Sequence, residues 1–329
     1  MAKVIIGIHG LGNKPYKELL EKWWKQSIIE GLNNICKDDI PDFKFKLVYW
    51  ADILHEKPLD QTIKNPNNPL FLDEPYIQGI KKTNYIQHKK RRKVLDFIGK
   101  QLNKLFLNKD FSINYQEFAD AILHRYFKDL EAYYKEKKTD NSGKPIYYKD
   151  IIRERLLQEL KVHKNDKVLL ISHSMGSIIA YDVLSMFNND INIDTLVTMG
   201  SPLGFPVVKG KIAAELKNKN TDLSKLTTPQ RVKSNWFNFS DIEDKVALDY
   251  RLADDFEKNK AGIKVIDFEV QNNYHVNENK NPHKSFGYLR TNEMAKVIFE
   301  FINGEKHVLK KRLRFKIFKF LIDIKIKTK

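Results

Sequence analysis

The stretch from Val168 to Ala180 constrains the fold more than any other part of this chain. It begins with an apolar run, Val-Leu-Leu-Ile, that predicts a buried strand, and it ends in Ser-Ile-Ile-Ala, which predicts the start of a helix. Three small residues, Ser172, Ser174 and Gly176, lie between the two, with Ser174 at the apex of the turn. A large side chain beside so tight a turn would block the close approach of the neighbouring backbone. The stretch therefore predicts a strand, a sharp turn and a helix in direct succession.

The core of this turn, Ser172 to Gly176, fits the G-x-S-x-G pattern with one departure, a serine where the first glycine is usual. In that pattern the middle serine is a nucleophile at strained backbone angles. Ser172 is small enough for the close approach, although glycine would fit more easily. We therefore predict that Ser174 is a nucleophile and that Ser172 and Gly176 support its turn.

Strands and helices alternate along most of the chain, which predicts an α/β fold. Such alternation implies a mostly parallel sheet with helices on both faces. Residues 55–161 lack the alternation and carry long helical patterns, so we predict a large helical insertion, or cap, there. The core is then predicted over 1–54 and 162–304, with a tail over 305–329. The predicted strands are residues 3–9, 43–49, 167–171, 195–199, 235–239 and 263–270.

A serine hydroxyl is a poor nucleophile near neutral pH, so Ser174 needs a general base within hydrogen-bond reach. His283 follows the last predicted strand and precedes a closing helix predicted over 288–302. His275 competes for this role, but His283 has the better spacing to the closing helix. We predict that His173, inside the turn, points away from Ser174 and serves packing.

The base in turn needs an orienting carboxylate, and two candidates follow the strand predicted over 235–239. The carboxyl ends of parallel strands are where sites in open α/β sheets gather. We favour Asp244 on motif fit and keep Asp241 as the alternative. The resulting order along the chain is Ser, Asp, His, which is the order expected for a strand-turn-helix nucleophile.

At four places the chain resembles the α/β-hydrolase superfamily, in particular its lipase and esterase branch. The resemblance covers residues 3–49 and 167–303. The four signatures are His9-Gly10-Leu11-Gly12 after the first strand, the turn from Ser172 to Gly176, the segment Gly200 to Leu203, and Asp244 to Val246 together with His283 to Leu289.

The resemblance implies roles for these residues. Ser174 would be the nucleophile, His283 the base and then the acid for the leaving group, and Asp244 the orienting carboxylate. The backbone N–H groups of Leu11 and Met175 would form the oxyanion hole, the pair of donors that binds the negatively charged oxygen. The residues that would support the oxyanion loop are His9, Gly10 and Gly12.

The net charge of +16 is concentrated towards the end of the chain. Residues 305–329 carry ten basic residues against two acidic ones, and their apolar residues recur at spacings of three and four. On a helix this pattern makes an apolar stripe beside a cationic face, which is typical of a membrane-surface helix and equally of a helix docked on its own domain. A possible partner is therefore an anionic membrane surface. We do not expect nucleic acid, because no nucleic-acid fold signature accompanies the charge.

Composition narrows the setting. The chain of 329 residues has a single cysteine, Cys36, and its first residues lead directly into a strand, so we expect neither disulfides nor a secretory signal. Without a run of about 18 apolar residues we expect no membrane-spanning helix, and we expect a cytoplasmic protein, with a peripheral position on the inner face of the membrane if the tail binds lipid. We expect no cofactor and no metal, and Gly10-x-Gly12 lacks the third glycine of a dinucleotide site.

Together these features predict a serine hydrolase that cleaves a carboxylic ester, with a lipid or other apolar acyl group as substrate. A thioesterase or amidase would use the same residues. The alternative from another class is a non-catalytic, membrane-associated binding or scaffold protein on the same fold. The ordered Ser174, Asp244 and His283 favour the enzyme.

Overall fold

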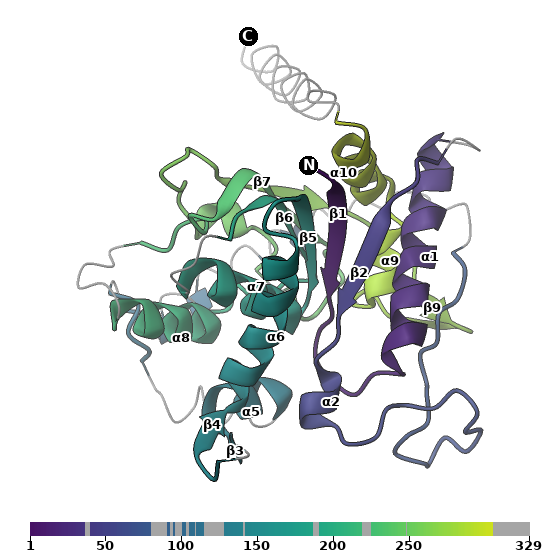
Figure 1. The fold of residues 1–329 in the computed structure, drawn as a ribbon, viewed down its shortest axis with the longest axis horizontal. Coiled ribbons are helices and arrows are strands. Elements are labelled where there is room, and N and C mark those ends of the chain that lie inside the picture. The colour runs from purple at the N-terminus through teal and green to yellow at the C-terminus, as the bar shows by residue number, and fades with distance from the viewer. Residues whose placement is uncertain are drawn as a thin grey trace.

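The structure, a computed structural model, describes most of the chain (Figure 1). The predicted tail, residues 305–329, and most of the middle of the predicted insertion lie outside the described residues, so the predictions made for them remain predictions. The described ranges are residues 1–36, 40–79, 91–92, 95, 101–102, 105–108, 110–114, 128–140, 142–186, 191–218, 225–247 and 249–304.

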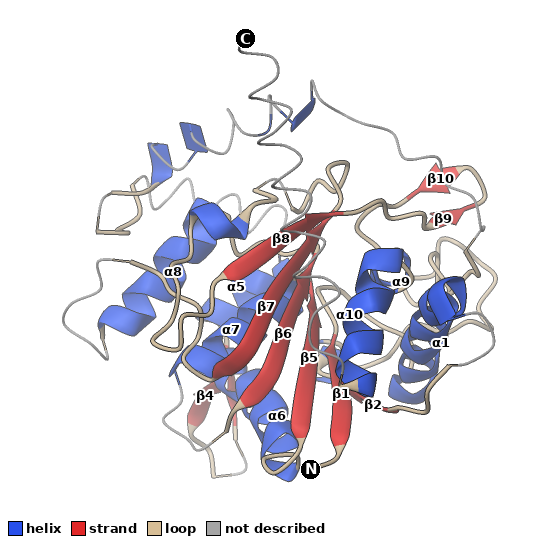
Figure 2. Ribbon diagram, turned by 90° about the horizontal axis from the view of Figure 1, so that it is seen from above, coloured by secondary structure: helices blue, strands red, loops and turns tan. Residues whose placement is uncertain are grey.

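A six-stranded sheet forms the centre of the molecule, in the order β2-β1-β5-β6-β7-β8 (Figure 2). All five pairings between neighbouring strands are parallel. The prediction of a parallel α/β sheet is therefore confirmed. The strands are β1 (Lys3–Ile8), β2 (Lys44–Val48), β5 (Lys167–His173), β6 (Ile193–Met199), β7 (Val232–Ser240) and β8 (Val265–Glu269).

Helices cover both faces of this sheet, because the central strands are apolar on both sides. In β1, Val4 and Ile6 belong to one hydrophobic cluster and Ile5 to the other, as expected where successive side chains point to opposite faces. Figure 2 shows α1, α9 and α10 on one side and α6, α7 and α8 on the other. The helices are α1 (Lys17–Cys36), α2 (Ala51–Leu54), α5 (Lys128–Lys135), α6 (Tyr148–Val162), α7 (Met175–Met186), α8 (Pro206–Lys217), α9 (Ser285–Leu289) and α10 (Asn292–Asn303).

The last part of the predicted insertion packs against the sheet. Helix α6 buries Ile152, Leu156 and Leu160, each 1% exposed or less, in the same cluster as Val168 of β5. This helix therefore contributes to a face of the core. Between α5 and α6 the chain forms a small hairpin, β3 (Lys137–Thr139) and β4 (Pro145–Tyr147), which the sequence analysis did not predict.

Two other helices differ from the prediction. The closing helix is divided at Arg290, because Thr291 starts a new helix by accepting a hydrogen bond from the Met294 backbone N–H at 3.3 Å. Helix α8 was missed altogether, since its Pro206 and Gly210 are residues typical of turns. Pro206 begins the helix, a position that needs no N–H donor. A Cβ on Gly210 would lie 2.4 Å from the Ile113 side chain, so the glycine admits a close neighbour.

A short antiparallel pair, β9 (His275–Val276) and β10 (Asn279–Lys280), lies between β8 and α9. A single-turn 3-10 helix, η1 (Leu252–Asp254), precedes β8. Within the described ranges, no helix combines the length and the apolar character needed to cross a membrane.

Candidate active site

Ser174 lies at a strained turn between β5 and α7, as the sequence predicts. Its φ is +52°, in the left-handed region that non-glycine residues rarely adopt, and its side chain is buried. The backbone N–H donates to the Met199 carbonyl of β6 at 3.0 Å, which ties the turn to the sheet. A Cβ on Gly176 would lie 2.7 Å from the carbonyl oxygens of both Ile8 and His9. The turn therefore requires glycine at 176.

Ser172 stands where the pattern usually has glycine, and the structure shows why serine fits. The residue is fully buried in β5, and its hydroxyl donates to the Val197 carbonyl of β6 at 2.8 Å. A buried hydroxyl without a partner would destabilise the fold, whereas this one is satisfied by the adjacent strand. The serine therefore adds a link between two strands beneath the turn.

Ser174, His283 and Asp244 form a continuous hydrogen-bonded chain. His283 Nε2 lies 3.0 Å from Ser174 Oγ, and His283 Nδ1 lies 2.8 Å from Asp244 Oδ2 and 3.0 Å from Oδ1. The Asp244 side chain is fully buried, while 26% of the His283 side chain remains exposed. With its Nδ1 proton bonded to the carboxylate, His283 presents the Nε2 lone pair to the serine hydroxyl.

Asp244 is itself held by several donors. Its Oδ2 accepts a hydrogen bond from the Tyr288 hydroxyl at 2.7 Å, and its Oδ1 accepts from the Val246 backbone N–H at 2.8 Å. Burial and the adjacent Asp244 charge raise the pKa of Tyr288 well above its ordinary value, so the hydroxyl stays a donor. The carboxylate is therefore fixed in orientation on both oxygens.

Asp241, the alternative acid, has a different role in the structure. Its carboxylate accepts from the backbone N–H groups of Glu243 at 2.8 Å and Asn272 at 2.6 Å. It thus joins the loop after β7 to the loop after β8. Burial raises its pKa. In the structure, Asp244 is the carboxylate that lies against His283.

Two other histidines lie near the predicted motifs in the sequence. His275 lies in β9, where its Nδ1 lies 3.0 Å from the Asn273 carbonyl. His173 is buried, and its Nε2 donates to the His283 carbonyl at 2.7 Å. Burial and the nearby His283 lower the pKa of His173 well below its ordinary value, so its ring stays neutral. His173 therefore does more than pack, because it holds the main chain of His283. The sequence signal for this role is the position of His173 next to Ser174.

Gly200, at the start of the third resembling segment, lies beside the histidine and the carboxylate. Its φ is +54°, and a Cβ there would lie 2.9 Å from Asp244 Oδ2 and 3.1 Å from His283 Nδ1. A larger residue would press against the hydrogen bond between them. The segment after β6 therefore leaves space for the histidine–carboxylate pair.

The predicted oxyanion loop lies directly against Ser174. A Cβ on Gly10 would lie 2.5 Å from Ser174 Cβ. His9 orients the loop: its Nε2 accepts from the Trp50 backbone N–H at 3.0 Å, so its Nδ1 carries the proton and donates to the Gly10 carbonyl at 2.9 Å. Burial lowers the pKa of His9 to about 3, which keeps the ring neutral. In a trans peptide N–H and C=O point in opposite directions, so the Leu11 N–H points away from His9.

The next peptide of this loop, between Leu11 and Gly12, is held at both its N–H and its carbonyl group. The Gly12 N–H donates to Asp129 Oδ2 at 2.6 Å, and Lys14 Nζ donates to the Leu11 carbonyl and, at 2.9 Å, to the Gly12 carbonyl. Gly12 has a φ of +80°. Met175, the other predicted donor, is the first residue of α7, where backbone N–H groups have no partner within the helix.

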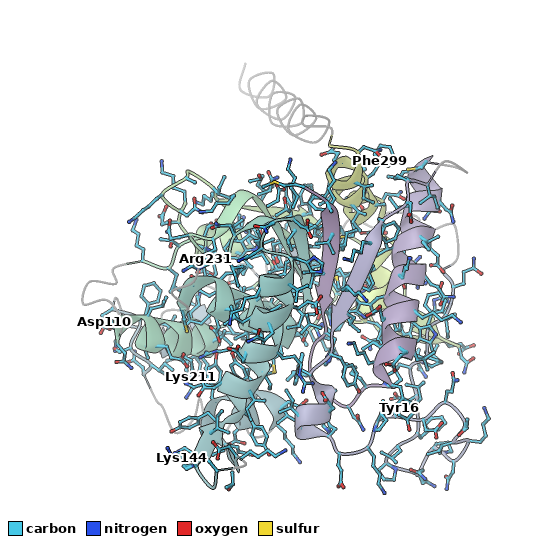
Figure 3. The ribbon with its side chains drawn as sticks, viewed as in Figure 1. Tyr16, Asp110, Lys144, Lys211, Arg231 and Phe299 are labelled. Carbon is cyan, nitrogen blue, oxygen red and sulfur yellow. The ribbon has the colours of Figure 1, made fainter. Side chains whose placement is uncertain are left out.

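A cavity of about 570 Å³ lies beside the end of β2 and the start of α1. Figure 3 labels Tyr16 near the start of α1. Tyr16, Tyr49, His55 and Arg155 are among the residues that line the cavity. Across the described ranges, no three His, Cys, Asp or Glu side chains gather in a way that would hold a metal ion.

The parallel sheet and the strand-turn-helix at its centre give the chain an α/β-hydrolase fold, and the predicted resemblance to that superfamily is confirmed. More narrowly, residues 142–243 match the family described as "PGAP1-like alpha/beta domain", to which this part of the chain is similar. The matched range includes Ser174 and ends just before Asp244. No curated protein matches the chain.

Proposed function

We propose that this protein is a serine hydrolase that cleaves carboxylic esters through an acyl-enzyme on Ser174. One observation carries the proposal: Ser174 Oγ, the His283 ring and the buried Asp244 carboxylate form an unbroken hydrogen-bonded chain with distances of 3.0 and 2.8 Å. The fold and the family match support a hydrolase in general. The ester substrate and the serine mechanism are our proposal.

In the first half of the reaction, His283 Nε2 takes the proton of Ser174 Oγ while the oxygen attacks the substrate carbonyl carbon. The carbonyl oxygen becomes an oxyanion, and the N–H groups of Leu11 and Met175 donate to it. Loss of one such donor typically costs about 2.7–4 kcal/mol of barrier. His283 then gives its proton to the departing alcohol oxygen, which leaves the acyl group on Ser174.

In the second half, water replaces the alcohol. His283 Nε2 takes a proton from the water as its oxygen attacks the acyl carbon, and the same two N–H groups receive the oxyanion. Collapse of this intermediate breaks the bond to Ser174 Oγ, which recovers the proton from His283. The acid is released, and the enzyme returns to its starting state.

For the substrate we propose a lipid or other ester with an apolar acyl group. The aromatic-rich insertion and the basic amphipathic pattern of residues 305–329 support this choice. We further propose that the tail binds an anionic membrane surface, so that the enzyme acts peripherally at the inner face of the membrane. Thioesters and amides use the same catalytic groups and are tested beside esters.

The test is labelling with a fluorophosphonate, which reacts with an activated serine. The wild type should be labelled and Ser174→Ala should not, while Ser142→Ala, a serine in the exposed β3–β4 turn, should match the wild type. Equal labelling of the wild type and Ser174→Ala would reject the proposal. No labelling of either would favour a binding or scaffold protein on this fold.

Matched p-nitrophenyl esters, thioesters and anilides of increasing acyl length then define the substrate. We expect hydrolysis of esters to exceed that of anilides and to rise with chain length. For the tail, removal of residues 309–329 should weaken binding to anionic liposomes and leave turnover of a short soluble ester intact. Unchanged liposome binding would reject the membrane proposal.

A further inference from the structure

The predicted insertion leaves the sheet after β2 and returns to it before β5. Its first part and its last part each carry one carboxylate that bonds to a loop of the site. We propose that Glu74 and Asp129 are positioning residues: Glu74 holds the loop that carries His283, and Asp129 holds the oxyanion loop. The insertion would then assemble the active site in addition to any part it has in binding substrate. This inference rests on the hydrolase proposed above.

Glu74 uses both of its carboxylate oxygens on the histidine loop. Its Oε1 accepts from Asn281 Nδ2 at 2.6 Å, and its Oε2 accepts from Lys284 Nζ at 2.9 Å. Asn281 in turn accepts, through Oδ1, a hydrogen bond from the His283 backbone N–H at 2.9 Å. Glu74 therefore hydrogen-bonds to residues on both sides of His283 and not to its ring.

The rest of this segment is docked on the same part of the molecule. The Tyr274 hydroxyl donates to the Pro75 carbonyl at 2.6 Å, and Arg290 Nη1 donates to the Ile77 carbonyl at 2.6 Å. These bonds go to main-chain carbonyls of the segment and hold it in place whatever side chain occupies position 74. A change at Glu74 should therefore alter the histidine loop more than it alters the docking of the segment.

Asp129 plays the matching part on the other side of the insertion. From the first turn of α5, its Oδ2 accepts from the Gly12 N–H at 2.6 Å and lies 3.3 Å from His55 Nε2. Only 14% of its side chain is exposed. The bond to Gly12 sets the plane of the Leu11–Gly12 peptide, which immediately follows the N–H predicted to bind the oxyanion. A carboxylate on a backbone N–H forms a charge-assisted bond, stronger than a neutral one.

The two carboxylates also balance two lysines beside the site. Burial, and then repulsion from Lys284, lowers the pKa of Lys14 to about 7, while Asp129 and Glu74 act in the opposite direction. Burial opposes the ionisation of Glu74 and of Asp129, yet the donors around each carboxylate hold its pKa below the ordinary value. Both therefore remain charged acceptors near neutral pH. Removing either would weaken the attraction that favours the charged form of Lys14 beside the oxyanion loop.

The experiment compares graded variants at each position in the full-length protein. Glu74→Gln keeps an acceptor for Asn281 but cannot pair with Lys284, and Glu74→Ala keeps neither. Asp129→Asn keeps an acceptor for Gly12, and Asp129→Ala does not. We expect kcat for a short soluble ester to fall by about 10- to 100-fold in the alanine variants and by less in the amide variants, because small misplacements of catalytic groups cost rates of this order.

KM for the short ester should change little, since the proposed role of Glu74 and Asp129 is to hold loops of the site and not to bind substrate. Fluorophosphonate labelling should slow in parallel with kcat. The control is Glu257→Gln, which breaks an exposed ion pair of 3.1 Å with Lys225 that has no part in holding the loops of the site. It should leave kcat and the rate of fluorophosphonate labelling unchanged. Near-ultraviolet circular dichroism establishes that each variant is folded.

Folded alanine variants with kcat within about twofold of the wild type would overturn the proposal, as would a KM effect with unchanged kcat. If an alanine variant does not fold, the folded amide variant at that position is judged instead. A kcat for it within about twofold of the wild type would then overturn the proposal. Failure of the hydrolase proposal is distinguishable, because the wild type itself would then show no Ser174-dependent labelling. Failure of the present inference leaves that labelling intact.

Discussion

The turn that carries Ser174 and the loop that carries His283 reach the same site by different means. Strand backbone and tight neighbours hold the turn: its N–H bonds to Met199, and Gly176 leaves no space for a Cβ. The histidine loop is held by side chains from far along the chain. His173 bonds to the His283 carbonyl, and Glu74 bonds to the residues beside it across more than 200 positions of sequence.

This difference predicts how the fold and the rate respond to substitutions in each region. Backbone carbonyls of the two neighbouring strands leave the turn no space to adjust, so substitutions there should damage the fold as well as the chemistry. The histidine loop depends on polar bonds that can be removed one at a time, so substitutions there should reduce the rate of a folded enzyme. Four predictions test this contrast.

The largest effect should come from the carboxylate that orients the histidine. Asp244→Asn should lower kcat by about 10⁴-fold, because an amide facing Nδ1 favours the wrong tautomer of His283. Asp241→Asn, which keeps one acceptor oxygen and loses one of two bonds to backbone N–H groups, should retain most of its activity. Steady-state kinetics with a short ester measures both. Equal losses would mean that the two carboxylates share the role.

The next effect concerns the turn. Gly176→Ala should lower the free energy of unfolding by about 3 kcal/mol, because the new methyl group meets two backbone carbonyls that cannot move aside. Gly143→Ala is a control for backbone strain without a contact: its φ is +80°, which costs an L residue about 1–2 kcal/mol, and nothing lies within 4 Å of the added Cβ, so its loss should be smaller. Urea denaturation compares them. Similar losses in both would show that the close contacts do not matter.

The third effect is on the pH dependence of the free energy of unfolding, to which His9 should contribute. Its folded pKa is lowered to about 3, whereas the unfolded chain titrates near 6.5, so between these values only the unfolded chain binds the proton. Stability from this residue is therefore present above about pH 6.5 and is lost as the pH falls towards 3. Between pH 7 and pH 5 the loss should be about 2 kcal/mol. The free energy of unfolding of His9→Gln should lack this component, and an equal slope in both proteins would contradict the assignment.

The smallest effect should follow from Tyr288→Phe, which keeps the buried ring but removes one donor to Asp244 and the acceptor of the Asp241 backbone N–H. We expect kcat to fall by about tenfold, equivalent to one hydrogen bond to a charged group, with an unchanged KM. The enzyme should stay folded, since the ring still fills its place in the core. A rate equal to that of the wild type would show that the backbone N–H groups of Val246 and Ala247, which donate to Asp244 Oδ1 at 2.8 and 3.4 Å, suffice to hold the carboxylate.

Local pattern was enough to predict most of the sheet. Strands such as β2, expected over 43–49, occur at Lys44–Val48, because alternating and clustered apolar residues report burial directly. Helix α8 was missed because Pro206 and Gly210 are typical of turns, and only their neighbours show why they suit a helix. The split between α9 and α10 was missed for a similar reason, since Thr291 as a helix cap lies inside an otherwise continuous apolar pattern.

The sequence by itself determined that the chain has a strand-turn-helix with Ser174 at its apex, and the order in which its acid and base candidates follow. These features are local, and steric limits on a few neighbouring residues are enough to specify them. Only the tertiary structure decided that Asp244 rather than Asp241 lies against His283, that His173 holds the histidine's main chain, and that Glu74 and Asp129 reach the two loops from the insertion. Those contacts join residues distant in sequence, and the folding of the sheet is what brings them within hydrogen-bond range.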